Sequence, residues 1–181
     1  HSWLADPGVE IPEQAAAVHG VTTEMAREQG RNAAEVVAEI GQKVQGYFAE
    51  GVPVVAYNAS YDFSILHHEM VRYGLTPLAE PRPIIDPLVI DRAVDTYRKG
   101  KRTLGMAAAH YLVSLDDSHR ADADAIAAGR VAHAILRTHS DTLTGDAQWL
   151  HDQQIEWARA WADNYQKFRR GSGDPGFVAS D

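Results

Sequence analysis

The segment 52–74 constrains the fold most, because a short apolar strand runs directly into a helix there. Residues 52–57 are apolar and half of them are β-branched, which is typical of a strand buried on both faces. The helix that follows carries Leu66, Met70 and Tyr73 at helical spacing. Strand–helix alternation of this kind predicts an α/β fold with a largely buried sheet.

Capping residues and periodicity predict the other elements. Asn32 and Thr103 are suitable N-caps, and Asp86 followed by proline is a typical helix start. A long final helix is expected from about residue 146 to residue 170. Its apolar stripe consists of Leu150, Trp157, Trp161, Tyr165 and Phe168.

Strands are predicted only over 2–5, 52–57 and 83–86. A sheet this small leaves a strand that is buried on both faces with too few hydrogen-bond partners. We therefore expect one α/β domain over residues 1–170 that lacks its N-terminal strands. A flexible tail is expected over residues 171–181, where glycine, serine and proline dominate.

Composition excludes several classes of protein. The chain of 181 residues has no cysteine, which excludes disulfides, thiolate–zinc sites and a cysteine nucleophile. No apolar run reaches the ~20 residues that cross a bilayer, so no membrane role is expected. The net charge of −8 argues against binding nucleic acid by bulk positive charge. Cationic residues cluster only at 98–102 and 167–170, where they either contact phosphate or are solvated. Trp157 and Trp161 are interpreted as core residues rather than base-stacking platforms.

Asp62 is the first candidate for chemistry. It follows the strand 52–57 within the first turn of a helix, at the edge where open α/β sheets bind ligands. A carboxylate there suits Mg²⁺ or Mn²⁺. The alternative is a carboxylate that only stabilises the helix dipole.

His119 and Asp124 are the second candidate. Their spacing puts the histidine in a loop before a helix and the aspartate in the first turns of that helix. The histidine could take a proton from water while the aspartate holds a metal ion. The alternative is ordinary acidic enrichment at a helix N-terminus.

The motifs that contain Asp62, His119 and Asp124 resemble those of a known family in order and spacing. The stretch 58–66 resembles the second motif of the DEDDh 3′-5′ exonucleases, and His119 to Asp124 resembles their third motif. Ile11-Pro12 with residues 18–22, and Asp86-Pro-Leu-Val, are similar to segments that flank the second motif in that family. The resemblance covers roughly residues 3 to 140. The whole chain looks like a DnaQ-like protein, the family of the proofreading epsilon subunit of DNA polymerase III.

The resemblance implies an RNase H-like fold and hydrolysis of phosphodiester bonds at 3′ ends of DNA with two Mg²⁺ or Mn²⁺ ions. Asp62 and Asp124 would bind the metal ions, and His119 would be the general base. Asn58 and His19 would lie near the terminal nucleotide. The implied partners are single-stranded DNA or another nucleic-acid 3′ end, and DNA polymerase III. The implied location is the cytoplasm.

One departure from the family leaves alternatives open. The family's first motif, Asp-x-Glu on the first strand, would supply two of four metal carboxylates, and this sequence does not contain it in that setting. The chain could thus be a catalytically impaired exonuclease-like module that binds a polymerase or a nucleic-acid end. An oligoribonuclease-type RNase is a further alternative, because contacts that distinguish the sugars cannot be located from sequence.

Overall fold

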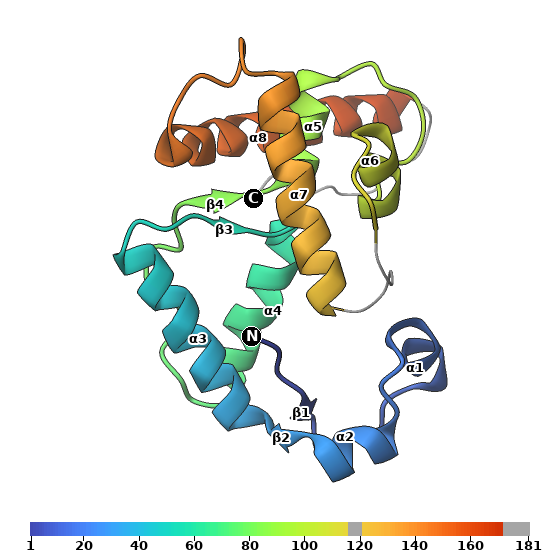
Figure 1. Cartoon of the computed structure of the whole chain (residues 1–181), viewed down its shortest axis with the longest axis vertical. Helices are drawn as coiled ribbons and strands as arrows, with labels where there is room; N and C mark the ends of the chain where they lie inside the picture. Colours follow the sequence, from blue (N-terminus) through green and yellow to red (C-terminus); the bar gives the residue numbers. More distant parts are fainter. Residues whose placement is uncertain (116–120, 172–181) are drawn as a thin grey trace.

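The computed structural model describes residues 1–115 and 121–171, and these form an α/β arrangement with short strands (Figure 1). Helices dominate it, and the long final helix is present as expected. In chain order the elements are β1 (Ala5–Asp6), α1 (Glu13–His19), α2 (Thr23–Gln29), β2 (Arg31–Asn32), α3 (Ala33–Ala49), β3 (Val54–Val55), α4 (Ala59–Arg72), β4 (Ile84–Ile85), α5 (Pro87–Val94), α6 (Leu104–His110), α7 (Ala121–Thr138) and α8 (Ala147–Gly171).

The predicted helix starts are confirmed. Oδ1 of Asn32 accepts hydrogen bonds from the N–H groups of Ala34 and Glu35, and Oγ1 of Thr103 accepts one from Met106. Asp86 caps α5, with Pro87 as its first residue. These caps satisfy N–H groups that a helix cannot satisfy itself, and each uses a partner two or three residues away. This is why sequence alone locates them.

The strands differ from the expectation of one buried sheet. They form two separate parallel pairs, β1 with β2 and β3 with β4. The strand predicted over 52–57 is reduced to Val54 and Val55, which are half-buried and not covered on both faces. The pair β1–β2 includes a strand that the sequence did not predict, because Asn32 serves both as the end of β2 and as the cap of α3.

Side chains of α8 occupy the outer edge of β4. The N–H of Ile84 donates to Nδ1 of His151 at 3.1 Å, and Nε2 of Gln154 donates to the carbonyl oxygen of Ile84 at 2.9 Å. The N–H of Asp86 donates to Oε1 of Gln154 at 2.6 Å. The backbone groups that a further strand would use are therefore already bonded.

The core lies where α5, α6, α7 and α8 meet above the β3–β4 pair (Figure 1). Ile90, Val131 and Ile135 are fully buried there, and Ala107 and Ala108 let α6 approach α7 closely. The stripe of α8 contributes Leu150 to this core, with Trp149 and Trp157 packed against it. The core interpretation therefore holds for Trp157 but is wrong for Trp161, which is 36% exposed.

The described part of the chain ends with α8, and its helices were compared with the length and polarity that a membrane span requires. Gly171 is the last residue of α8, and the rest of the tail predicted over 171–181 lies outside the described residues. Within the ranges 1–115 and 121–171, no helix is long and apolar enough to cross a membrane. The division into one domain and a tail stays a prediction.

Candidate active site

Asp62 lies in the first turn of α4, close behind the carboxyl end of β3. The chain turns sharply between the two elements at Asn58, whose φ of 65° and ψ of 48° are left-handed. Asparagine adopts this conformation more readily than most residues because its short polar side chain tolerates it. Asn58 makes no side-chain capping bond to α4. The sequence thus located Asp62 at the correct sheet edge, while the roles of Asp62 and Asn58 stay predictions.

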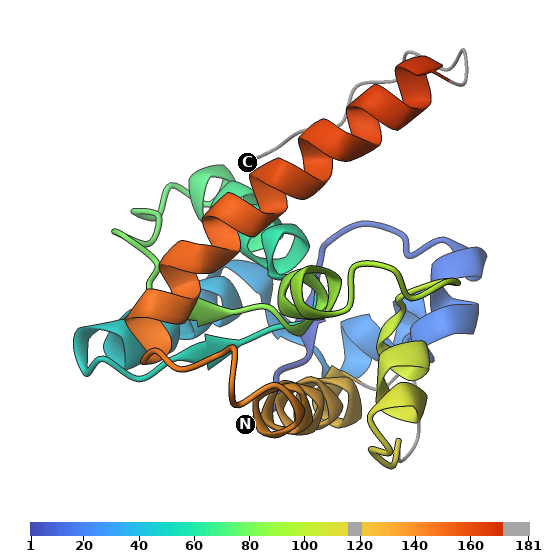
Figure 2. The ribbon, with the colours of Figure 1, turned by 90° about the horizontal axis from the view of Figure 1, so that it is seen from above.

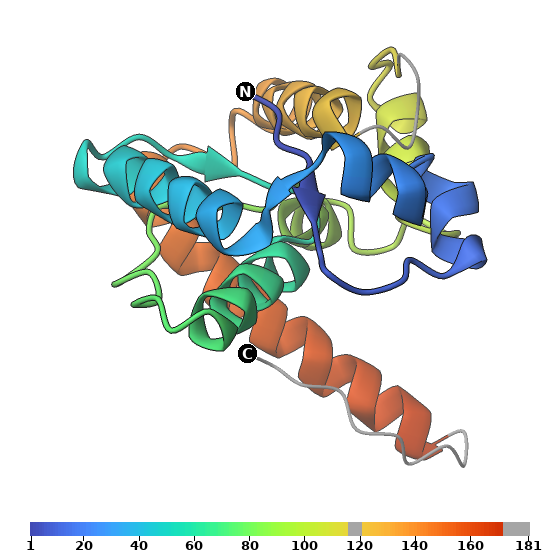
Figure 3. The ribbon, with the colours of Figure 1, turned by 90° about the horizontal axis from the view of Figure 1, so that it is seen from below.

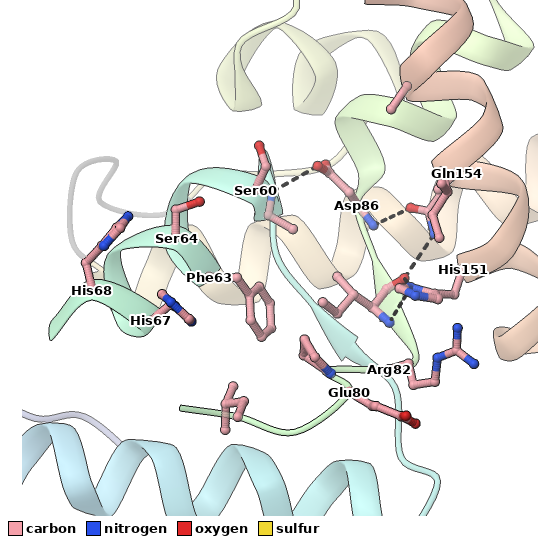
Figure 4. A pocket seen from close by; sticks show the side chains of 16 residues that line it. Ser60, Phe63, Ser64, His67, His68, Glu80, Arg82, Asp86, His151 and Gln154 are labelled. Atoms are coloured by element: carbon pink, nitrogen blue, oxygen red, sulfur yellow. Dashed lines mark hydrogen bonds between the residues drawn. The ribbon is translucent and has the colours of Figure 1, made fainter. Parts of the chain in front are cut away.

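The carboxylate of Asp86 holds this helix start in place. Its Oδ1 accepts hydrogen bonds from the N–H groups of Asn58 and Leu88, each at 2.9 Å, and its Oδ2 accepts one from Ala59 at 2.9 Å. Figure 4 shows Asp86 between the start of α4 and Gln154 of α8. One buried side chain therefore joins the beginnings of α4 and α5.

The pKa values of Asp62 and Asp86 are both raised, so that each carboxyl ionises less readily than a free aspartate. Burial is the largest cause that raises the pKa of Asp86, and the N–H groups that it accepts from only partly oppose the rise. Asp62 is exposed as a whole, yet partial desolvation by the surrounding protein raises the pKa of its carboxyl, and the charge of Asp86 adds to the rise. Two acids with raised pKa values in one region favour a cation beside them.

The other predicted site residues lie on separate elements. Asp124 is half-buried in the first turn of α7. His19 ends α1 and is exposed, and its Nδ1 accepts a hydrogen bond from the N–H of Val21 at 3.2 Å. His119 lies outside the described residues. Their assignments therefore stay predictions.

The described residues do not by themselves fit a resident metal ion. In the ranges 1–115 and 121–171, no three His, Asp or Glu side chains are grouped closely enough to hold one. A catalytic zinc ion usually has three protein ligands, whereas Mg²⁺ is usually held by one or two carboxylates together with water and substrate phosphates. Asp62 and Asp124 consequently offer carboxylates without completing a centre.

A cavity of about 730 Å³ opens on another side of α4. Residues 60, 63, 64 and 67 of α4 line it, together with the segment 78–86 and the first half of α8 (Figure 4). These four positions share one face of the helix, and position 62 projects from the opposite face. The cavity and Asp62 are therefore separate features.

The cationic segment 98–102 turns largely inward. Arg98 and Arg102 both bind the carboxylate of Asp91, which is fully buried in α5, and the Tyr111 hydroxyl donates to the same carboxylate at 2.8 Å. Arg102 also donates to backbone carbonyl oxygens of Asp91 and Asp95. The two arginines are thus committed to an internal ion cluster, so both readings of 98–102, phosphate contact and solvation, are wrong for them.

Comparison with known proteins decides the family. A family model described as "Exonuclease" matches residues 2–132, a range that includes both Asp62 and Asp124. The chain belongs to this exonuclease family. The DnaQ-like resemblance seen in the sequence is thereby confirmed, and the mixed α/β structure with its C-terminal helix agrees with a partial RNase H-like exonuclease fold. Helix α8 lies beyond the matched range.

Curated relatives of this chain include proteins whose names refer to DNA polymerase III. A protein named "DNA polymerase III PolC-type" from Lacticaseibacillus paracasei is 30% identical over 132 residues, which are 73% of this chain and 8% of that protein. A "DNA polymerase III subunit epsilon-like protein" from Rhodobacter capsulatus is 32% identical over 91 residues, which are 50% of this chain and 12% of that protein. The chain spans about a tenth of the length of these relatives.

Sequence reasoning missed what Asp86 and Gln154 do. Asp86 was identified as a helix cap, and its bond to the N–H of Leu88 confirms this. Its bonds to Asn58 and Ala59 span 28 and 27 residues and leave no local signal. Gln154 is a buried polar residue within an apolar stripe, and a stripe interrupted by glutamine is the only hint that the sequence offers.

Proposed function

We propose that this chain is a 3′-5′ exonuclease unit that hydrolyses phosphodiester bonds at the 3′ ends of DNA. The observation that carries the proposal is the family match over residues 2–132, a range in which Asp62 and Asp124 each lie in the first turn of a helix. The relatives named as DNA polymerase III proteins support DNA as the substrate and a polymerase as a partner, in the cytoplasm.

In this proposal the chain's own residues orient acids and move a proton. Asp86 fixes the first turn of α4 through two backbone N–H groups, so that Asp62 is held in one position. His119 is the proposed general base that takes the proton of the attacking water. His19 and Asn58 are proposed to contact the terminal nucleotide.

Divalent ions would supply charge stabilisation at the cleaved phosphate. Asp62 and Asp124 are the proposed ligands, and two Mg²⁺ or Mn²⁺ ions are the expected number. Because the ranges 1–115 and 121–171 hold no group of three such donors, we expect this chain to bind the ions weakly until substrate phosphates add further ligands.

A cleavage assay tests the proposal. The full chain is incubated with a 5′-labelled single-stranded DNA in the presence of Mg²⁺ or Mn²⁺, and shortening from the 3′ end is followed on a gel. His119→Ala should reduce the rate by about 10²-fold or more if His119 is the base. Asp124→Asn should reduce it as well, while Asp141→Asn, a change of an exposed acid outside the proposed site, should leave the rate unchanged.

The second candidate function is a binding module that has the exonuclease fold without the activity. The lack of a three-donor metal group among the described residues favours it. Retention of labelled DNA without any shortening would support the module and refute the enzyme. An RNA oligonucleotide of the same sequence, if shortened faster than the DNA, would identify an oligoribonuclease-type RNase instead.

A further inference from the structure

The second half of α8 projects beyond the packed elements of the protein. Figures 2 and 3 show the helix extending beyond the other elements toward its C-terminal end. The face of α8 that lies against β4 and the cavity includes His151, Gln154 and Ala158. The same face continues at intervals of three and four residues through Trp161, Tyr165 and Phe168. The apolar stripe thus runs on where the body no longer covers it.

The three aromatic side chains form a continuous row. The rings of Trp161 and Tyr165 are stacked with centroids 5.1 Å apart and planes 10° apart, and those of Tyr165 and Phe168 are 6.5 Å and 22° apart. Their exposed fractions are 36% for Trp161, 38% for Tyr165 and 69% for Phe168. Exposure increases along the row, so its outer end presents nearly a whole ring to solvent.

Cations flank the row on both sides. The guanidinium of Arg92, on α5, lies 3.9 Å from the centroid of the Trp161 ring, and that of Arg169 lies 5.9 Å from the centroid of Tyr165. Lys167 and Arg170 are exposed in the same last turns of α8, but at 100° per residue they project from the side of the helix away from the row. This concentration of positive charge stands out in a chain whose net charge is −8.

We propose that the row formed by Trp161, Tyr165 and Phe168, with its flanking cations, binds single-stranded nucleic acid. Exposed aromatic rings next to cations suit a strand that stacks its bases and places its phosphates beside positive charge. An uncharged or basic protein helix would gain from the rings but not from the cations, and an acidic one would gain from the cations but has no flat bases to stack, so rings and charge together favour nucleic acid.

The row also lies close to the candidate site. The inner end of the row contacts α5 through Arg92, and the carboxylate of Asp86 that caps α5 also accepts hydrogen bonds at the start of α4. A strand held on α8 would accordingly be tethered to the body beside the acids of α4. The inference rests on the proposed function only in taking nucleic acid as the ligand.

Binding without cleavage tests the row directly. Fluorescence anisotropy of a 5′-labelled oligodeoxythymidylate is measured with the full chain in excess EDTA, which removes divalent ions. The double variant Tyr165→Ala/Phe168→Ala should bind at least about tenfold more weakly than the wild type, because it removes the exposed outer end of the row, on which a base can stack. Tyr47→Ala, which removes an exposed aromatic ring from α3, is the matched control and should bind normally. Circular dichroism verifies that each variant is folded.

The salt dependence separates charge from stacking. Replacing Arg169, which contacts Tyr165, by glutamine should reduce the slope of log affinity against log salt by about 0.7 for the phosphate contact that is lost, while the same change at Arg170, on the other side of α8, should leave the slope unchanged. The proposal is overturned if the wild type does not bind the oligonucleotide, or if the double aromatic variant binds it as tightly as the wild type. It is also overturned if that variant changes only the oligomeric state, since the row would then be a protein interface.

The two assays can refute the proposed exonuclease activity and the proposed binding to the row independently of each other. Binding through the row without shortening of the DNA would refute the proposed exonuclease and leave this inference standing. Normal shortening with an unchanged KM in the double aromatic variant would refute this inference and leave the exonuclease standing.

Discussion

Replacing Asp86 by alanine should destabilise the protein and release the start of α4. The change removes the acceptor of three N–H groups, of which those of Ala59 and Leu88 are buried. A buried donor left without an acceptor costs about 1–3 kcal/mol, so the two buried groups cost about 2–6 kcal/mol together. The raised pKa of Asp86 shows that its burial carries a desolvation cost, which the alanine variant no longer bears. We therefore expect a net loss of about 2–4 kcal/mol in the free energy of unfolding.

Urea unfolding followed by circular dichroism near neutral pH measures this loss. Asp86→Asn should lose less than the alanine variant, since its amide oxygen can still accept from Asn58 and Leu88 while its NH₂ group faces the N–H of Ala59. Asp152→Ala is the control, because that carboxylate is exposed and its contact with Arg82 is 3.7 Å long. We expect it to lose less than about 1 kcal/mol.

Hydrogen exchange locates the effect. In the alanine variant the amides of Ala59 and Leu88 should exchange much faster than the amides of the α7 core. The reasoning is refuted if the variant unfolds at the wild-type urea concentration, or if these two amides keep their protection.

Two further changes test the ion cluster around α5. Asp91→Ala leaves Arg98 and Arg102 with uncompensated buried charge and should cost about 3–5 kcal/mol in urea unfolding; a loss below about 1 kcal/mol would contradict a structural role. The Tyr57 hydroxyl donates to the carbonyl oxygen of Arg102 at 2.8 Å, and burial raises its pKa from 10.0 to about 12. Because the folded pKa lies above the unfolded one, the stability contributed by this phenol is complete below pH 10 and is lost as the pH rises through about 12. Tyr57→Phe should flatten that part of the stability profile, and an unchanged profile would contradict the assignment.

The fold and site were predictable from sequence where partners are close along the chain. Asn32 and Thr103 were recognised because a cap bonds to groups two or three residues away. The order of the acidic motifs was recognised because its spacing is a linear property. The start of α4 depends on a carboxylate more than 25 residues away, and linear patterns do not encode such a contact.

The sequence was least reliable in predicting whether a cationic residue is buried in an ion pair or exposed. Arg98 and Arg102 look like a solvated loop in the sequence, yet the buried carboxylate of Asp91 draws both inward. Lys167 and Arg170, an equally basic pair, are exposed at the end of α8. Whether a cation is structural or available thus depends on the element packed against it.

The side chains of His151 and Gln154 on the edge of β4 determine in which direction the small sheet can grow. The bonds between β3 and β4 use the backbone of Val54 and Ala56, so the alternation of a strand directs the N–H and C=O of Val55 to the other side. Any strand that enlarges the sheet must therefore add beside β3. Helix α8 therefore keeps β4 as the outermost strand on that side of the sheet, and it prevents other chains from pairing with this edge.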